Sequence, residues 1–243
     1  MGYRVKCIVS YDGTNYHGWQ RQNKLPSIQA TIEDSLQRLN NGVFISIHGA
    51  SRTDQGVHAL AQVFHFDCDL DIPIERMALA INTYLPPDIF IVSAERVDDS
   101  FHARKSATCK TYEYRLRLNE YAPLERYTKG FAKGTFNLVT MQKELSSIVG
   151  THSFESLTQD ADYDTYERTI YEASIIPTED GLLLKVSGSG FLRHMVRILM
   201  GTLLDIGSGK TKSMQELLAS KDRTLAGIKV GPEGLYLIKV MYE

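Results

Sequence analysis

The stretch SRTDQGVHALAQVFHFD, residues 51–67, contains the two features on which the predicted fold and function depend. Its second part, ALAQVFHFD at residues 59–67, is mostly apolar and aromatic and predicts a strand. Its first part, SRTDQGVHA, contains one glycine and a single carboxylate, Asp54, and predicts a loop. The question is whether Asp54 only shapes a turn or belongs to a hydrolase triad, a metal site or a nucleophile.

Periodic segments surround this stretch in the first half of the chain. Apolar residues at every second position predict a strand around Val5–Val9, and a long loop follows at residues 11–22. Ser27 is the N-cap candidate for a helix over residues 28–39. The other predicted elements are a strand at 43–47, a helix at 72–85 that ends before Pro86-Pro87, and a strand at 89–97.

The second half shows a similar order of elements. Residues 110–118, KTYEYRLRL, alternate strictly and predict a strand. The remaining predicted elements are a helix at 138–150, strands at 169–177 and 181–190, helices at 191–207 and 211–220, and a last strand at 234–242. We therefore predict an α+β protein of two related lobes, residues 1–100 and 101–243, with mostly antiparallel sheets flanked by helices.

Composition excludes several classes of protein. Hydrophobic residues make up 43% and charged residues 23% of the 243 residues, which is typical of a globular chain. No apolar run reaches the roughly 18–20 residues that cross a membrane, and the N-terminus has no apolar signal region. The three cysteines, Cys7, Cys68 and Cys109, are far apart, which favours a reducing cytosol over disulfides or a thiolate zinc site. We therefore expect a cytoplasmic protein with no membrane partner.

Charge is unevenly distributed along the chain. The net charge is −2, yet residues 102–133 are strongly basic. The basic residues are Arg104, Lys105, Lys110, Arg115, Arg117, Arg126, Lys129 and Lys133, and the acidic ones are Glu113, Glu120 and Glu125. A basic face on a near-neutral chain is typical of an RNA-binding protein, although a solvated pair of basic strands would show the same excess.

Most chemical interpretations of Asp54 can be eliminated. A GxSxG element is absent, which argues against a triad with Ser51 and His58. The histidines are scattered without an HExxH element, so no metal site is predicted. GSGKT at 207–211 lacks the first P-loop glycine, because Leu204 stands in its place. What remains is a turn residue or a functional carboxylate.

Three features favour a functional carboxylate. Arg52 lies two residues before Asp54, so in extended backbone their side chains share a face and could form an ion pair. Gly56 allows another backbone or a ligand to approach. Arg193, His194 and Arg197 are expected on an otherwise apolar helix, with the two arginines on one stripe. A buried arginine needs an anion, either a structural carboxylate or one kept ionised as a nucleophile.

Four segments of the chain resemble, in order and spacing, the TruA-type tRNA pseudouridine synthase family. They are YDGTNYHGWQRQ (11–22), SRTDQGVHALAQV (51–63), FHARKSATCKTYEYRL (101–116) and FLRHMVRILMG (191–201). The resemblance covers nearly the whole chain and includes the closing GLYLIKVMY. The RTDxGVHA element is the most specific of these motifs.

The resemblance implies a reaction and a site. Members isomerise uridine to pseudouridine in tRNA, typically at positions 38, 39 and 40 of the anticodon stem-loop, without a cofactor or metal. They are typically homodimers, with each active site in a cleft between two α+β lobes. The family's invariant Asp falls on Asp54, its base-stacking Tyr on Tyr112, its helix Arg on Arg197 and its motif Arg on Arg52.

Further residues are expected to bind RNA phosphates, which positions RNA without reading its sequence. Those from the basic stretch and the N-terminal loop are Arg21, Lys24, Arg104, Lys105 and Lys110. Arg193 and His194 are expected either to extend this surface or to line the cleft. His58 is expected to be structural.

The chain departs from the family pattern at a few positions. Ser51 replaces a usual Gly, Gln55 a usual Ala, and Ser153 the Asp of a usual His-Asp-Phe element. These departures affect the expected RNA target more than the chemistry, so a paralogue with a shifted tRNA target stays open. A catalytically silent tRNA-binding relative and a small-molecule hydrolase that uses Asp54 or Ser51 stay open as well.

Overall fold

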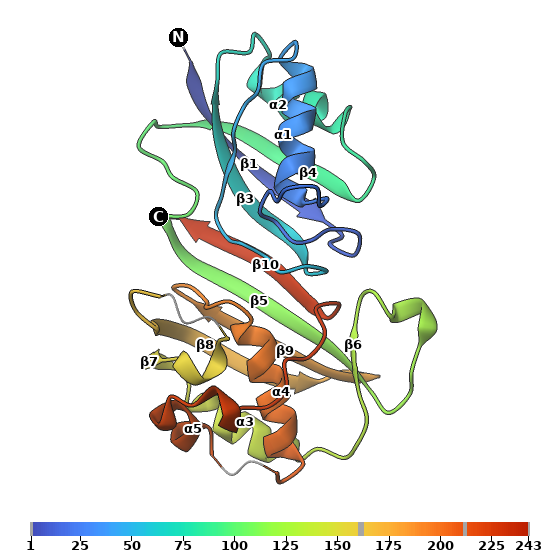
Figure 1. Cartoon of the computed structure of the whole chain (residues 1–243), viewed down its shortest axis with the longest axis vertical. Coiled ribbons are helices and arrows are strands. Elements are labelled where there is room, and N and C mark those ends of the chain that lie inside the picture. Colours follow the sequence, from blue (N-terminus) through green and yellow to red (C-terminus); the bar gives the residue numbers. More distant parts are fainter. Residues whose placement is uncertain (1, 160–162, 211–212, 243) are drawn as a thin grey trace. The chain divides into compact units, whose positions relative to one another are not determined.

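The computed structural model describes residues 2–159, 163–210 and 213–242, and the chain divides into two compact units. Unit 1 extends to Thr108 and includes the end of the chain from Leu237, whereas unit 2 spans Cys109–Tyr236 (Figure 1). The division therefore falls after residue 108 rather than near residue 100. The last strand returns to unit 1 because it pairs with a strand of that unit.

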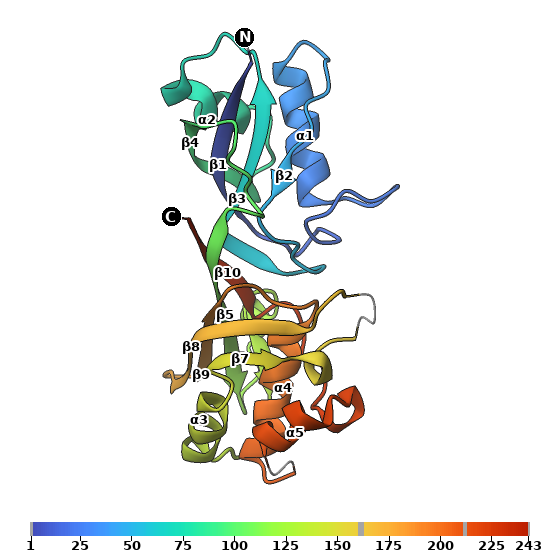
Figure 2. The same ribbon diagram turned by 90° about the vertical axis from the view of Figure 1, so that its left-hand side faces the viewer.

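Unit 1 is an antiparallel sheet with two helices. Its strands are β1 (Tyr3–Tyr11), β3 (His58–Cys68), β4 (Ile89–Val97) and β10 (Leu235–Tyr242), in the order β4-β1-β3-β10, and its helices are α1 (Ile28–Leu39) and α2 (Ile74–Asn82). Val5, Cys7 and Val9 are fully buried on one face of β1, which confirms the predicted alternation. Both views show α1 beside these strands (Figures 1 and 2). Ser27 caps α1 by accepting the Ala30 N–H, as predicted.

The predicted strand at residues 43–47 is wrong. In this part of the chain only His48 and Gly49 (β2) join a ladder, with β3, and residues 43–47 form none. The backbone of Ile47 is bound by side chains of α1 instead. Its N–H donates to the buried Glu33 carboxylate at 3.2 Å, and its carbonyl accepts from Gln29 Nε2 at 3.3 Å. Because the N–H and carbonyl of Ile47 are bound to these side chains, they are not available to pair with a neighbouring strand.

Among the described residues, unit 2 contains five strands and three helices. Its strands are β5 (Ala107–Leu118), β6 (Gly130–Ala132), β7 (Gly150–Ser153), β8 (Glu167–Pro177) and β9 (Gly181–Gly188), and its helices are α3 (Leu138–Ser146), α4 (Met195–Gly207) and α5 (Met214–Ser220). The antiparallel order is β5-β9-β8-β7, and the short β6 runs parallel to β5. Three short 3-10 helices, Pro123–Glu125, Glu155–Leu157 and Arg223–Leu225, were not predicted.

The three predicted helices of unit 2 have different bounds in the structure. α3 ends at Ser146, not at Gly150, because turns follow it and Gly150, with φ of 110°, begins β7. α4 begins at Met195 rather than residue 191, since His194 has a left-handed φ of 65°. The predicted helix at 211–220 is observed from Met214, and residues 211 and 212 lie outside the described residues.

The apolar helix α4 is crossed closely by the segment that leads to β10. A Cβ on Gly201 would lie 1.9 Å from the Ile228 carbonyl oxygen, so only glycine permits this approach. The Gly227 N–H donates to Thr202 Oγ1 at 3.0 Å and fixes the crossing. This crossing places the carbonyl of Val230 at the first turn of α4.

The predicted fold class is confirmed: the chain is α+β, with mostly antiparallel strands flanked by helices. Within the described residues, every helix is too short or too polar to pass through a membrane.

Glu33 and Asp34 offer a matched test of the α1 network. Both carboxylates pair with Arg21, but Glu33 is 2% exposed and Asp34 61%. We expect Glu33→Ala to lower the free energy of unfolding by about 2–3 kcal/mol, because it leaves buried donors unpaired. Asp34→Ala should cost less than about 0.5 kcal/mol. Urea denaturation of both variants measures this, and equal losses would contradict a structural role of Glu33.

Candidate functional site

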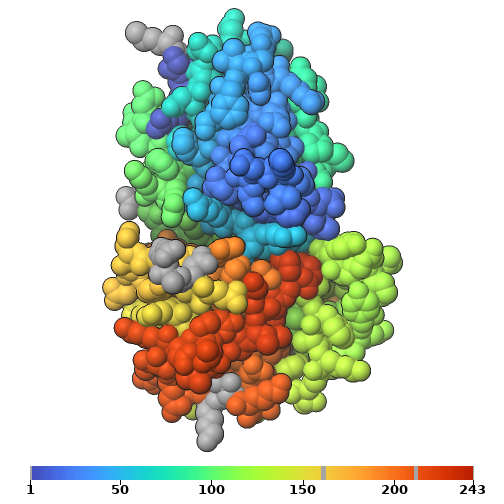
Figure 3. Space-filling view, in the orientation of Figure 1, coloured from blue at the N-terminus to red at the C-terminus, as the bar shows by residue number. Residues whose placement is uncertain are grey.

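The Asp54 loop is held by the long loop at residues 11–22. The Trp19 N–H donates to the Thr53 carbonyl at 3.1 Å, and the Gly56 N–H donates to the Tyr16 carbonyl at 3.2 Å. These bonds lie on both sides of Asp54, which is half-buried. In Figure 3 the holding loop, in blue, lies on the visible surface of unit 1. The backbone that carries Asp54 is therefore fixed by another part of the chain.

Aromatic side chains support the Asp54 loop from within unit 1. The Tyr11 hydroxyl and Thr53 Oγ1 form a buried hydrogen bond of 2.8 Å. The buried Trp19 ring lies between Tyr11 and Phe64, with centroids 6.1 and 6.2 Å away. A Cβ on Gly49 would lie 2.5 Å from this indole, so the ring fills its space completely. Sequence periodicity does not single out Trp19, although it is the one tryptophan of the 243 residues.

Two glycines make the contact between the loops possible. Gly18 has φ of 88°, and a Cβ there would lie 2.5 Å from the Thr53 carbonyl oxygen. Gly56 has φ of 76°, in a turn closed by the Val57 N–H donating to the Asp54 carbonyl. The structure therefore explains Gly56 by backbone conformation. The room for RNA that the sequence suggested at Gly56 stays a prediction.

The other residues of the motif differ in their environment. Arg52 is exposed and, among the described residues, forms no ion pair, so the predicted pairing with Asp54 is not observed. His58 is buried and its Nδ1 accepts the Gly13 N–H at 3.1 Å, which is a structural contact. Of the departures from the family pattern, Ser51 accepts from Gln62 Nε2 through its carbonyl, and Gln55 is exposed.

Tyr112 and Arg197 belong to unit 2 and are described within it. Tyr112 lies on β5 opposite Val186, is 6% exposed, and meets the Phe191 ring edge-on at 5.1 Å. Arg197 lies in the first turn of α4, is 8% exposed, and donates from Nε to the Val230 carbonyl at 2.8 Å. The chain crossing at Gly201 brings this carbonyl to Arg197.

The predicted stripe of Arg193 and Arg197 is wrong. Arg193 precedes α4 and is exposed, and His194 occupies the left-handed N-cap position. The backbone of Arg193 is fixed on both sides, since its N–H donates to the Tyr163 hydroxyl and its carbonyl accepts from Thr158 Oγ1. Arg193 and His194 therefore belong to a shaped loop, not to the helix.

Part of the predicted RNA-binding charge is neutralised within the protein. Arg21 donates to Glu33 and Asp34, so it is a structural cation of the α1 network. Lys24, by contrast, is exposed next to a small bridge between Gln22 and Leu25. Lys24 therefore fits the predicted role better than Arg21 does.

The basic stretch of β5 is also less basic than its sequence suggests. Arg117 pairs with Glu125 at 2.8 Å and with Asp180 at 3.0 Å, and Lys129 contacts the same two carboxylates. Lys129 is the main reason that the pKa of Asp180 is lowered. These groups line an open hollow of about 840 Å³. Arg115 stacks on Tyr236 at 4.0 Å. Asp180 is far away in sequence, so counting neighbouring charges missed it.

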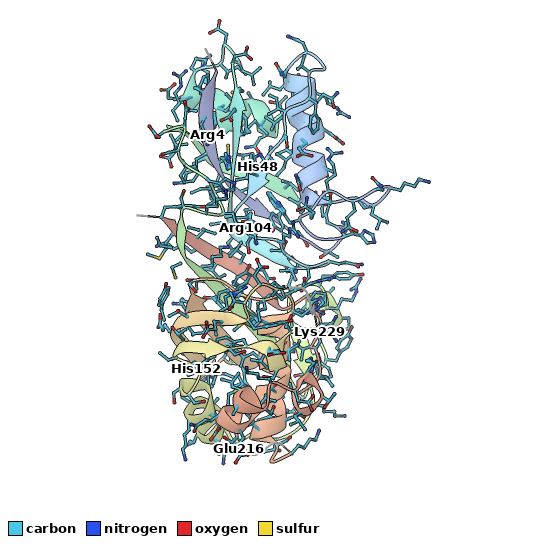
Figure 4. All side chains as sticks on the ribbon, turned by 60° about the vertical axis from the view of Figure 1, so that its left-hand side comes forward. Arg4, His48, Arg104, His152, Glu216 and Lys229 are labelled. Atoms are coloured by element: carbon cyan, nitrogen blue, oxygen red, sulfur yellow. The ribbon has the colours of Figure 1, made fainter. Side chains whose placement is uncertain are left out.

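Arg104 and Lys105 lie on a turn, residues 102–106, that two histidines hold. Ala103 N–H donates to His65 Nδ1, and the N–H groups of Arg104 and Lys105 point at His102 Nδ1 at 3.2 and 3.4 Å. Both cations are exposed, and Arg104 is labelled in Figure 4. Lys110 lies further along β5, half-buried and opposite Gly188.

The rings of this turn form a cluster with a third histidine. His48 stacks on His65 at 5.1 Å, and His102 tilts against His65 at 4.9 Å. Burial, then the charges of Arg4, His102 and His48, lower the pKa of His65 to about 4. Burial and Lys105 lower the pKa of His102. No group of three or more potential ligands within the described ranges could hold a metal ion.

Comparison with known proteins relates this geometry to a family. A family model described as "tRNA pseudouridine synthase" matches residues 7–104 and 145–243. Proteins named "tRNA pseudouridine synthase A" are similar over nearly their whole length. They come from Thermoanaerobacter sp. (strain X514), 41% identical over 98% of this chain and 99% of theirs, and Exiguobacterium sp. (strain ATCC BAA-1283 / AT1b), 42% over 99% and 98%.

A third relative of the same name, from Streptococcus pyogenes serotype M1, is 41% identical over 99% of both chains. Among solved structures, a chain of a Cbf5-Nop10-Gar1 complex aligns with 96% of this chain and 57% of its own, at 10% identity and a TM-score of 0.36.

Gly18 and Gly42 offer a matched test of the loop contact. Both have positive φ, but a Cβ on Gly42 would meet nothing within 4 Å. We expect Gly42→Ala to cost about 1–2 kcal/mol of unfolding free energy, from backbone conformation alone. Gly18→Ala should cost about 1–3 kcal/mol more, because it pushes on the Thr53 carbonyl. Urea denaturation measures both variants, and equal losses of unfolding free energy would contradict the close approach of Gly18 to the Thr53 carbonyl.

The lowered pKa of His65 predicts a pH dependence of stability. The unfolded chain takes up a proton on this ring below about pH 6.5, whereas the folded ring resists protonation until about pH 4. Its contribution to stability is therefore complete above pH 6.5 and is lost as the pH falls towards 4. His65→Phe should flatten the decline of unfolding free energy measured between these values. An unchanged decline would contradict the assignment.

Proposed function

The chain belongs to the tRNA pseudouridine synthase family and is a tRNA-uridine isomerase, and from this premise we propose its target and its nucleophile. The proposed target is uridine in the anticodon stem-loop, at positions 38, 39 and 40. The proposed nucleophile is Asp54. Both proposals rest on the ordered motifs of the sequence, and the second is supported by the rigid loop of unit 1.

The reaction rearranges bonds without changing composition. The C1′–N1 bond of uridine breaks, the uracil turns, and a C1′–C5 bond forms. A proton leaves C5, and N1 gains one. Because atoms and electrons balance within the substrate, the chemistry calls for no oxidant, reductant or group carrier. The protein has to break one bond, keep the two fragments together and move the protons.

The observation that carries the assignment of Asp54 is the restraint of its loop. Hydrogen bonds from Trp19 and Gly56 fix the backbone on both sides of it. A nucleophile gains most when its direction of attack is fixed before the substrate arrives. The Asp54 carboxylate can attack C1′ of the ribose or C6 of the base, and either adduct holds the fragments while the uracil turns.

We propose roles in the reaction for Tyr112, Arg197 and Arg52. A tyrosine ring offers a flat surface on which an extruded base can stack, worth roughly 1–3 kcal/mol. This offsets part of the cost, about a few kcal/mol, of taking the base out of its stack. Arg197 donates from Nε to the Val230 carbonyl, and we propose that its positive charge keeps the reacting carboxylate ionised. We propose that the exposed Arg52 binds the RNA.

The resemblance supports two further proposals about the protein in the cell. We propose that it acts as a homodimer and that it is cytoplasmic, where unmodified tRNA and reduced cysteines occur together. The buried Cys7 and Cys68 and the half-buried Cys109 are free thiols, which agrees with a reducing compartment.

A second candidate differs only in the RNA target. Ser51 and Gln55 flank the proposed nucleophile, and Ser153 lies at the end of β7, where Glu167 pairs with it. These are the positions at which the chain departs from the family pattern. A paralogue with a shifted target would modify uridines outside positions 38–40.

Asp54→Asn tests the nucleophile, and Asp12→Asn is its matched control. Asp12 lies in the neighbouring loop, where its side chain accepts from Thr14, a bond that asparagine can preserve. We expect Asp54→Asn to fall below about one thousandth of the wild-type rate, whereas Asp12→Asn stays active. The measurement is single-nucleotide mapping of pseudouridine in unmodified tRNA transcripts.

Each outcome of this mapping decides one part of the proposal. Wild-type protein that makes no pseudouridine overturns the activity and supports a silent tRNA-binding relative. Full activity of Asp54→Asn overturns the nucleophile. Pseudouridine outside positions 38, 39 and 40 overturns the proposed target and supports the paralogue.

A further inference from the structure

The turn at residues 102–106 is a basic segment of unit 1 that is held by several hydrogen bonds. Its three consecutive N–H groups, from Ala103 to Lys105, are directed at imidazole nitrogens of His65 and His102. The turn is also closed on itself, since the His102 N–H donates to Ser106 Oγ and the Ser106 N–H to the His102 carbonyl. Its shape is therefore set without any ligand.

The sheet holds the same turn from two more directions. The Tyr242 hydroxyl of β10 donates to the Ala103 carbonyl at 2.8 Å. Arg4 of β1 donates to the carbonyls of Asp99 and Phe101, just before the turn, while it also binds Asp67 through two nitrogens. Because the backbone of this segment is held by many hydrogen bonds, it loses little further conformational entropy when its exposed side chains bind a ligand.

The exposed cations of this turn are not neutralised by the protein. Arg104 and Lys105 form no ion pair with any residue that the structure describes. The nearby Asp67 carboxylate is bound by Arg4, and the Asp98 carboxylate accepts from the Ser100 N–H. Arg21, Arg117 and Lys129 all contact carboxylates, so Arg104 and Lys105 differ from them.

The two imidazole rings that accept the N–H groups of the turn carry no charge near neutral pH. A ring nitrogen that accepts an N–H cannot hold a proton, so Nδ1 of His65 and of His102 is unprotonated here. The lowered pKa values of both rings agree with this state. The exposed His48 ring continues the surface beside them, 5.9 Å from His102.

We propose that the turn at residues 102–106 is a preformed binding site for phosphodiester groups of the tRNA backbone, with Arg104 and Lys105 as its cations and His48 at its rim. His65 and His102 are positioning residues that hold the turn. The proposal rests on the proposed function, because it takes tRNA as the ligand. Fixed cations of this kind set the position of RNA and leave its sequence unread.

The first experiment removes the two charges. Arg104→Gln with Lys105→Gln should raise the Kd for an unmodified tRNA transcript at least about tenfold. It should also reduce the slope of log Kd against log salt by about 1.4–1.8, the release of counterions from two phosphates. The control, Arg76→Gln with Lys143→Gln, removes the same charge from exposed helix positions and should change neither quantity.

The second experiment tests whether His102 positions Arg104 and Lys105 or only supports the fold. An asparagine side chain can accept the N–H two residues ahead, as His102 Nδ1 does, so His102→Asn preserves the turn. His102→Phe keeps a ring but loses the acceptor. We expect His102→Asn to keep the wild-type Kd within about twofold, and His102→Phe to weaken binding at least about fivefold with Arg104 and Lys105 still present.

The outcomes distinguish this proposal from the proposed function. Wild-type Kd and salt slope in the double variant overturn the site, as does equal weakening by the control. Equal Kd values for the two His102 variants overturn the positioning role. Pseudouridine formation by the wild type is measured separately, so the enzyme activity can stand when the site fails, and tRNA binding at the turn can stand when the activity fails.

Discussion

Two main-chain hydrogen bonds, from Trp19 to Thr53 and from Gly56 to Tyr16, are the constraint on which the geometry of Asp54 depends. They require two loops to lie in direct contact, which a side chain at Gly18 would prevent. They also require the Trp19 ring to fill the space beneath. The backbone that carries this carboxylate is thus held by a loop that lies far away in the sequence.

Periodicity predicted those elements whose apolar residues recur at helix or strand spacing. The bounds of α1 and β4 agree with the prediction. The predictions failed where one residue intervenes. Glu33 takes the N–H of Ile47 from a would-be strand, and His194 turns the chain with a positive φ before α4. The hydrophobic pattern of the sequence predicts neither this hydrogen bond nor this positive φ.

The candidate site shows the same division. Elimination left Asp54 as a turn residue or a functional carboxylate, and only ordered motifs associated it with Tyr112 and Arg197. Local spacing suggested partners that the structure does not contain, such as Arg52 for Asp54, since spacing fixes a shared face but not an ion pair. Charge counting failed for a related reason: Asp180 pairs with Arg117 and Lys129 although it lies 63 and 51 residues further along the chain.

The use of histidine in the turn at residues 102–106 follows from the charge that the turn has to preserve. A carboxylate could accept the same N–H groups, as the Asp98 side chain does for Ser100. It would, however, attract the adjacent Arg104 and Lys105 and repel a phosphate. A neutral imidazole accepts the N–H without adding negative charge. In the α1 network the opposite choice holds, because Arg21 serves the fold and is paired with Glu33. The charge of the acceptor therefore separates Arg21, which is paired within the protein, from Arg104 and Lys105, which we propose bind RNA.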